Sequence, residues 1–224
     1  MAAISRRARP DLGRLIMVPT AAVLLILDLS ALTHTGANDA SRALGGGASE
    51  GLRWLGALLV CAFYLLIIWC YLRRSPATAT TSSVTARVAA VAATLTPFAF
   101  PLLHGAPAGV GRQSVADGLL VAGTGWALWS LRCLGRNLSV FAQARELADG
   151  GPYRWIRHPL YAGEIVSSLG LALAAGTVAA FALWLALCAL QGYRVLREEQ
   201  LLLQALPQYR SYRSRTAALF PGLF

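Results

Sequence analysis

Residues 151–163 read GPYRWIRHPLYAG, and they lie between two long apolar runs. Proline fixes φ and lacks an N–H donor, so Pro159 predicts that a helix begins directly after it and that His158 stays outside the helix. Arg154, Arg157 and His158 place three basic side chains within five residues. Such a turn at the mouth of a membrane helix is suited to an anionic or zwitterionic ligand. The alternative is a positively charged loop that only sets membrane orientation.

The composition predicts an integral membrane protein of one structural domain. Of its 224 residues 56% are hydrophobic and 13% are charged, against about 25% charged residues in soluble domains. The formal net charge is +10, and all 20 basic residues are arginine. No long basic run or soluble module is present to bind nucleic acid. Abundant Ala and Arg without Lys fit a GC-rich bacterial genome, so we expect a bacterial inner-membrane protein.

The four cysteines indicate packing rather than metal binding. Cys61, Cys70, Cys133 and Cys188 all fall in apolar stretches, and no CxxC or Cys/His spacing resembles a zinc site. We therefore expect four small buried hydrophobes and no metal ligands.

The first two thirds of the chain predict four membrane helices, because a span needs about 20 apolar residues. The runs are 15–32, 52–72, 84–103 and 115–134. The Gly-rich stretch 33–51 is expected to be a loop. A basic start before the first run also fits a secretory signal peptide, but Asp28 lies within the run and no small-x-small cleavage site follows, so a helix is favoured.

Prolines and glycines mark special points in these runs. Pro97 and Pro101 are expected to kink or end the third helix. Gly118, Gly123 and Gly125 are expected to let the fourth helix approach its neighbours closely.

The apolar stretch 162–190 is too long for one vertical span, and Gly176-Thr177 near its middle predicts a hairpin of two helices. A single long tilted helix is the alternative. The last helix is expected to continue, amphipathic, until Pro207. Glu164 and Asp28 are read as the only acids deep in spans, without matching partners.

Arginine distribution favours the hairpin. With six spans and both termini cytoplasmic, 17 arginines fall inside and 3 outside, as the positive-inside rule requires. A single last helix would send the tail and its five arginines outside. The predicted fold class is therefore an all-α integral membrane protein with about six membrane-embedded helices.

The hairpin brings two polar clusters together at the cytoplasmic face. One end carries Tyr153, Arg157, His158 and Tyr161, and the other carries Arg194, Glu198 and Glu199. Because charged groups at a membrane boundary are costly, they are candidate functional residues. A purely structural Arg–Glu network that ties the helix ends together is the alternative.

Other chemistries find no support in the sequence. There is no Ser/His/Asp spacing, no glycosidase carboxylate pair and no phosphate-binding loop, since Gly45-Gly46-Gly47 lacks the following Lys and Ser/Thr. What remains is a polar cofactor site beside an apolar cavity, an arrangement suited to transfer chemistry on a lipid.

Three features of this half resemble the isoprenylcysteine carboxyl methyltransferase family, which shares a superfamily of integral membrane methyltransferases with the phospholipid methyltransferases. They are GPYRWIRHPLYAG at 151–163, Glu198-Glu199, and Tyr209-x-x-Tyr212-x-x-Arg215 before Pro221. The segment 134–139 also resembles the family, and the resemblance covers about residues 130–224. It implies N-terminal transmembrane helices in 1–134 and a methyltransferase catalytic region in 135–224.

The resemblance also implies S-adenosyl-L-methionine as cofactor. Its pocket would be lined by Tyr153, Arg157, His158, Pro159 and Tyr161, and Glu198 would contact it. Glu146 and Leu147 match a further lining segment, but Arg145 stands where the family usually has His, so backbone contacts are expected there.

The acceptor is expected to be a lipid-like or small hydrophobic molecule. A carboxylate acceptor is favoured, with Arg194 orienting it, whereas an amine acceptor would need a base, for which Glu199 is the candidate by position. The alternatives are a NADPH-dependent reductase with a related sterol-reductase-like fold, and a non-enzymatic membrane protein or transporter.

Overall fold

The structure is a computed structural model. It describes residues 12–39, 48–74, 79–80, 83–103, 105–106, 108–139, 143–144 and 147–220, with only the backbone described at 12, 31–39, 48–49, 79–80 and 143–144.

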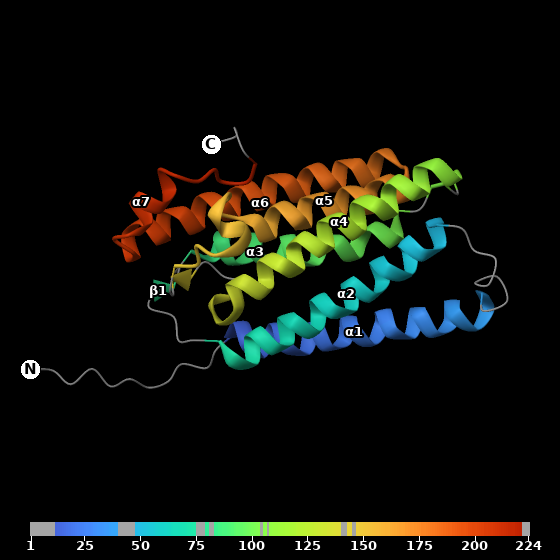
Figure 1. Ribbon diagram of the computed structural model, residues 1–224, viewed down its shortest axis with the longest axis horizontal. Coiled ribbons are helices and arrows are strands. Elements are labelled where there is room, and N and C mark those ends of the chain that lie inside the picture. The colour runs from blue at the N-terminus through green and yellow to red at the C-terminus, as the bar shows by residue number, and fades with distance from the viewer. Residues whose placement is uncertain are drawn as a thin grey trace, which may run out of the picture.

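Helices make up nearly all of the described chain, which confirms the predicted all-α fold class (Figure 1). The longer elements are α1 (Leu12–Asp39), α2 (Ala48–Arg73), α3 (Val84–Leu95), α4 (Val110–Leu134), α5 (Pro159–Ala175) and α6 (Val178–Ala205). The shorter helical elements are η1 (Thr96–Leu102), η2 (Gly135–Asn137), η3 (Gly151–Arg154) and α7 (Tyr209–Arg213). The helices are accompanied by one small antiparallel pair of two-residue strands, β1 (Ala79–Thr80) and β2 (Gln143–Ala144).

Among the described residues, four helical segments are long and apolar enough to cross a membrane. They are Gly13–Ser30, Glu50–Arg73, Val84–Leu102 and Val178–Ala205. The apolar helix α5 has 17 residues, and α4 has 25. Large apolar side chains on the outside, such as Leu58, Val88 and Leu185, are 60–62% exposed, as expected of a surface that faces lipid.

The helix boundaries correct the sequence reading at the first connection. Both α1 and α2 extend into the stretch 33–51 that was expected to be a loop, since α1 ends at Asp39 and α2 begins at Ala48. The proline expectations are confirmed. Helix α3 gives way to the 3-10 helix η1 at Thr96, directly before Pro97, and α5 begins at Pro159 with His158 at φ −123°, ψ 57°.

The hairpin prediction is confirmed, and a single long helix is excluded. Helix α5 ends at Ala175, and the next residue, Gly176, has a φ of +64°, a left-handed conformation that favours glycine. Thr177 then caps α6 by accepting a hydrogen bond from the backbone N–H of Ala180 (3.2 Å). The two helices lie side by side, and the Trp184 indole donates to the Ile165 carbonyl (3.1 Å).

Successive long helices run back and forth, so the end of α2, the end of α4 and the end of α6 gather at one end of the bundle (Figure 1). We call this the polar end. Among the described arginines, only Arg53 and Arg112 belong to helix starts at the opposite end. The arginine asymmetry of the sequence is thus an asymmetry between the two ends of the bundle.

The contact between α4 and α5 depends on small residues. A Cβ at Gly123 would lie 2.7 Å from the Gly163 carbonyl oxygen and 2.8 Å from Cα of Ser167. Of the three glycines expected to permit close approach, only Gly123 does so. A Cβ at Gly118 or Gly125 would meet nothing within 4 Å.

The expectation that all four cysteines are buried is partly wrong. Cys61 and Cys70 are buried, whereas Cys188 is half-buried and Cys133, near the end of α4, is exposed.

We expect Gly123→Ala to lower the free energy of unfolding by about 1–3 kcal/mol, because a methyl group there overlaps the backbone of α5. Gly125→Ala is the matched control on the same helix and should leave stability unchanged or slightly raise it. Thermal unfolding in detergent measures both. Equal melting temperatures for the two variants would contradict the assigned α4–α5 contact.

Candidate functional site

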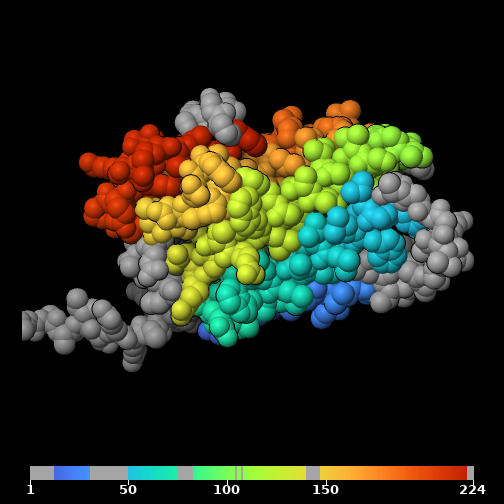
Figure 2. Space-filling view, in the orientation of Figure 1, coloured from blue at the N-terminus to red at the C-terminus, as the bar shows by residue number. Residues whose placement is uncertain are grey.

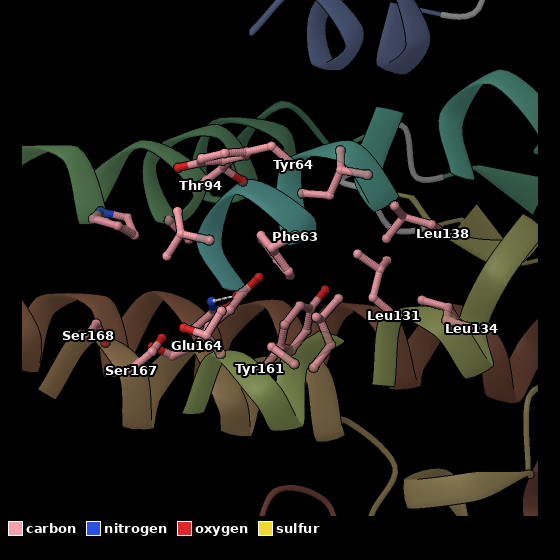
Figure 3. Close-up of a pocket in the computed structure, with 18 of the residues that line it drawn as sticks. Phe63, Tyr64, Thr94, Leu131, Leu134, Leu138, Tyr161, Glu164, Ser167 and Ser168 are labelled. Atoms are coloured by element: carbon pink, nitrogen blue, oxygen red, sulfur yellow. Dashed lines mark hydrogen bonds between the residues drawn. The ribbon is translucent and has the colours of Figure 1, made fainter. Parts of the chain in front are cut away.

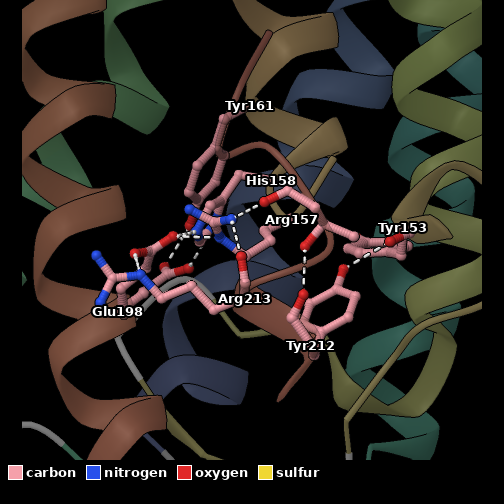
Figure 4. Close-up of polar contacts among 9 residues, drawn as sticks. Tyr153, Arg157, His158, Tyr161, Glu198, Tyr212 and Arg213 are labelled. Carbon is pink, nitrogen blue, oxygen red and sulfur yellow. Dashed lines mark hydrogen bonds and ion pairs between the residues drawn. The ribbon is translucent and has the colours of Figure 1, made fainter. Parts of the chain in front are cut away.

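Arg157 is the centre of the polar end. It follows η3, immediately before the start of α5, and its side chain is 4% exposed. Its Nε donates to Glu199 Oε1 of α6 (2.6 Å), and its Nη1 donates to the carbonyls of Arg213 (3.1 Å) and Thr216 (Figure 4). One buried guanidinium therefore joins the start of α5, the end of α6 and the C-terminal tail.

The backbone of the tail pairs with the turn before α5. Arg157 N–H donates to the Ala217 carbonyl (2.8 Å), and His158 N–H donates to the Ala218 carbonyl (3.0 Å). The Tyr212 hydroxyl donates to the Tyr153 carbonyl (2.7 Å), and burial raises the pKa of Tyr212 to about 12, which keeps this donor protonated. Figure 2 shows the tail (red) lying beside the segment that contains this turn. The tail thus closes one side of the site.

His158 lies between the two adjacent glutamates of α6. Its Nδ1 is 3.7 Å from Glu198 Oε2, and its Nε2 is 3.5 Å from Glu199 Oε1. The imidazole stacks on the Tyr161 ring, with centroids 5.7 Å apart and planes 7° apart, and the Tyr161 hydroxyl donates to Glu198 Oε1. Each glutamate therefore has a separate set of neighbours, Glu199 on the arginine side and Glu198 on the tyrosine side.

Deeper in the bundle, three polar side chains form a chain of hydrogen bonds. The Arg194 guanidinium lies 4.4 Å from the Tyr161 ring centroid, and its Nη1 donates to Gln191 Oε1 (3.1 Å). Gln191 Nε2 donates in turn to Glu164 Oε2 (2.5 Å). The expectation that Glu164 has no partner is therefore wrong. Glu164 on α5 faces Gln191 on α6 across the hairpin.

A cavity of about 670 Å³ opens beside these groups. Its walls come from α1 to α7, η1, η2 and η3, and most of the side chains around it are apolar (Figure 3). Phe63, Leu131 and Leu138 line the part near Tyr161. The polar end thus passes directly into an apolar chamber inside the bundle.

Several polar atoms at this end of the cavity are buried without a hydrogen-bond partner among the described residues. They are His158 Nε2, the Tyr209 hydroxyl and Asn137 Oδ1. All three residues line the cavity. Unpaired buried polar atoms are rare in folded proteins, so these point to a polar ligand or to bound water. Sequence reasoning did not single out Asn137 or Tyr209 as binding residues, although Tyr209 opens the YxxY pattern.

The structure brings most of the expected site residues together. Those that line the cavity are Leu147, Tyr153, Arg157, His158, Tyr161, Arg194 and Glu198. Pro159 and Glu199 are buried beside it without lining it. Glu146 lies outside the described residues, as does Arg145. Gln191 and Glu164 were missed as a pair because they are 27 residues apart in the sequence.

Residues 112–208 match the model of the phospholipid methyltransferase family. This match confirms the predicted resemblance to the superfamily of membrane methyltransferases, over a segment that runs from the start of α4 to the residue before α7. The segment is therefore similar to the phospholipid methyltransferases.

Two curated relatives match a shorter part of the chain. One is the cobalt-zinc-cadmium resistance protein CzcN of Cupriavidus metallidurans, 37% identical over 78 residues, which cover 34% of this chain and 36% of the relative. The other is the nickel-cobalt-cadmium resistance protein NccN of Alcaligenes xylosoxydans xylosoxydans, 35% identical over 82 residues, covering 36% and 38%. The chain thus matches little more than a third of each relative's length. In the described part of the chain, no group of three or more His, Cys, Asp or Glu side chains is placed to hold a metal ion.

Among solved structures, the eukaryotic intramembrane Ras methyltransferase ICMT (isoprenylcysteine carboxyl methyltransferase) aligns with 94% of this chain and 96% of its own, at 16% identity and a TM-score of 0.45.

We expect Arg157→Met to release the tail, because removal of one partner of a buried ion pair typically costs about 3–5 kcal/mol. Trypsin should then cleave after Arg210, Arg213 and Arg215 about tenfold faster or more, since cleavage needs local opening of the tail. Arg154→Met is the matched control, since Arg154 is exposed. Equal cleavage rates in the two variants would show that Arg157 does not hold the tail.

Proposed function

We propose that this protein is an S-adenosyl-L-methionine-dependent methyltransferase that acts within the membrane on a lipid-like or small hydrophobic acceptor. One observation carries the proposal. A cluster of buried polar groups, some without hydrogen-bond partners in the described part of the chain, opens directly into an apolar cavity of about 670 Å³. A polar cofactor and an apolar acceptor would meet at such a boundary, and the family match supports methyl transfer as the chemistry.

The residues present fit the cofactor, because Tyr209 and Asn137, which lack hydrogen-bond partners among the described residues, and the nearby His158 offer the hydrogen-bonding groups that a polar molecule needs. Tyr153, Tyr161 and Leu147 would supply the walls, and Glu198 would accept hydrogen bonds from it. By the resemblance, Glu146 would add backbone contacts. Arg157 and Pro159 would act by shaping the turn that carries His158.

When bound, the cofactor supplies an electrophilic methyl group on a sulfonium, and transfer leaves the S–CH₃ electron pair on sulfur. The protein needs to align the acceptor with this group and exclude water, because in-line displacement gains most from positioning. The apolar walls around Phe63, Leu131 and Leu138 would exclude water from the acceptor side.

Arg194 is the residue proposed to orient the acceptor, and a carboxylate acceptor is favoured. Its guanidinium is buried in the cavity wall over Tyr161, so it does not reach outward to the interface as a snorkelling side chain would. Glu199 is better suited to hold Arg157 than to act as a base, since its oxygens already accept from Arg157 and lie 3.3 Å from Nε of Arg213. The division into N-terminal helices at 1–134 and a catalytic region at 135–224 stays a prediction. Residues of both ranges line the cavity, so both would contribute to the proposed site.

The proposed setting is a bacterial inner membrane, with the polar end and both termini on the cytoplasmic side. The support is the concentration of arginine at that end. A reporter fused after residue 224 that is active only on the outer side of the membrane would contradict this orientation.

We expect detergent-purified protein to bind S-adenosylhomocysteine and not NADPH in a calorimetric titration. His158→Ala and Glu198→Ala should each weaken S-adenosyl-L-methionine binding about tenfold or more, because loss of one charged hydrogen bond typically costs about 1.5–3 kcal/mol. Arg197→Ala is the control, because Arg197 is adjacent to Glu198 and exposed. Binding of NADPH alone would favour the reductase alternative, and unchanged affinity in both variants would remove the site assignment.

We expect Arg194→Ala to lower methyl transfer far more than it lowers cofactor affinity, once a methyl acceptor has been found. Arg194→Lys keeps the positive charge but loses the planar guanidinium with its paired N–H donors. If the acceptor is a carboxylate held by two hydrogen bonds, turnover in the Lys variant should stay as low as in the Ala variant. Turnover and cofactor dissociation constants for wild type, Ala and Lys test this. Full turnover in the Lys variant would exclude the proposal that Arg194 holds an acceptor carboxylate by two hydrogen bonds. Equal losses of binding and turnover in the Ala variant would place Arg194 in the cofactor site.

A further inference from the structure

The cavity has a second polar region, centred on Asp117 of α4. This side chain is 6% exposed and lines the cavity. Its Oδ1 accepts from Gln113 Nε2 (2.8 Å), whereas its Oδ2 is buried and has no hydrogen-bond partner among the described residues. A buried carboxylate oxygen without a partner is costly, and in a membrane protein it marks a functional position. The sequence reading had overlooked Asp117, which lies inside the expected span 115–134.

Asp117 lies well away from the polar end. Gly163 of α5, the residue before Glu164, packs against Ala127 of α4, and Asp117 is ten residues earlier on α4. At 1.5 Å per residue, Asp117 is about 15 Å from that contact along the axis of α4. The proposed methyl-transfer site and the Asp117 region are therefore two separate parts of one cavity.

The surroundings of Asp117 combine acids with aromatic rings. Helices α2 and α4 run in the same direction, as Gly56 beside Leu120 and Arg136 bonded to the Arg73 carbonyl show. Trp54 is thus near the level of Asp117 and lines the cavity, whereas Tyr64, stacked on Phe98, lines it ten residues farther along α2.

Carboxylates outnumber cations in this half of the cavity. Glu50 and Arg53, at the start of α2, line this part of the cavity with Asp117, and Asp28 lines it farther along, near Cys61 and Tyr64. The Oδ2 atom of Asp28 is also buried without a partner among the described residues. Acidic and aromatic side chains around an apolar chamber favour an organic cation, which gains from both the carboxylate and the ring faces.

We propose that the Asp117 region binds the ammonium group of a membrane amphiphile, whose apolar chain lies along the cavity toward Tyr161. The Asp117 carboxylate is the counter-ion, and Trp54 supplies the aromatic wall. This site does not depend on methyl transfer, and it holds an ammonium group remote from the polar end.

The test measures binding of radiolabelled dodecyltrimethylammonium to the full-length protein in dodecyl maltoside by equilibrium dialysis, with neutral dodecanol as the matched probe. Wild type should bind the ammonium probe about tenfold or more tighter than dodecanol. Asp117→Asn keeps an acceptor for Gln113 and removes the charge, so it should abolish most of this preference and leave dodecanol binding unchanged.

Asp149→Asn is the matched control, because it removes the same charge from an exposed residue outside the cavity. It should bind both probes as wild type does. Three results would overturn the proposal: no preference for the ammonium probe in wild type, an unchanged preference in Asp117→Asn, or an equal loss in Asp149→Asn. The wild-type comparison decides even if Asp117→Asn fails to fold, and cofactor titration of the same samples reports separately on the proposed methyltransferase site.

Discussion

The buried pairing of Arg157 with Glu199 is the interaction on which the polar end depends. Each group is costly to bury alone, and each is compensated by the other at 2.6 Å. The remaining donors of Arg157 reach carbonyls of the tail, so the same guanidinium holds a third segment. If the start of α5 and the end of α6 separate, a buried charge is left unpaired, and if the tail moves away, Nη1 of Arg157 loses its carbonyl acceptors.

The hairpin determines what the pair can organise. Gly176 reverses the chain, and the close α4–α5 contact at Gly123 sets the position of α5 against the rest of the bundle. Together these place the start of α5 beside the end of α6, where His158 and Tyr161 face Glu198. Glu199 thereby pairs with Arg157, while the adjacent Glu198 lines the cavity.

The number of paired charges inside the bundle falls from the polar end toward the opposite end. Paired charges occupy the polar end, the hydrogen-bonded Arg194–Gln191–Glu164 chain follows, and Asp117 lies farther along. In a membrane protein, water is scarce inside and polar groups must find partners within the fold. Among the described residues, the Tyr209 hydroxyl, Asn137 Oδ1 and Asp117 Oδ2 have no hydrogen-bond partner, so these atoms are the most informative about ligands.

The sequence by itself determined the helical membrane class, the hairpin turn at Gly176-Thr177 and the polar cluster from Tyr153 to Glu199, because apolar length, glycine and proline act locally. Only the tertiary structure decided which of three glycines makes a close contact, that α1 extends through 33–39, and that Glu164 pairs with Gln191. It also decided that the carbonyls of Arg213 and Thr216 accept hydrogen bonds from Arg157, and that Asp117 lines the cavity. The physical reason is that hydrogen bonds and burial between distant segments depend on how helices pack, and periodicity within one segment carries no record of its neighbours.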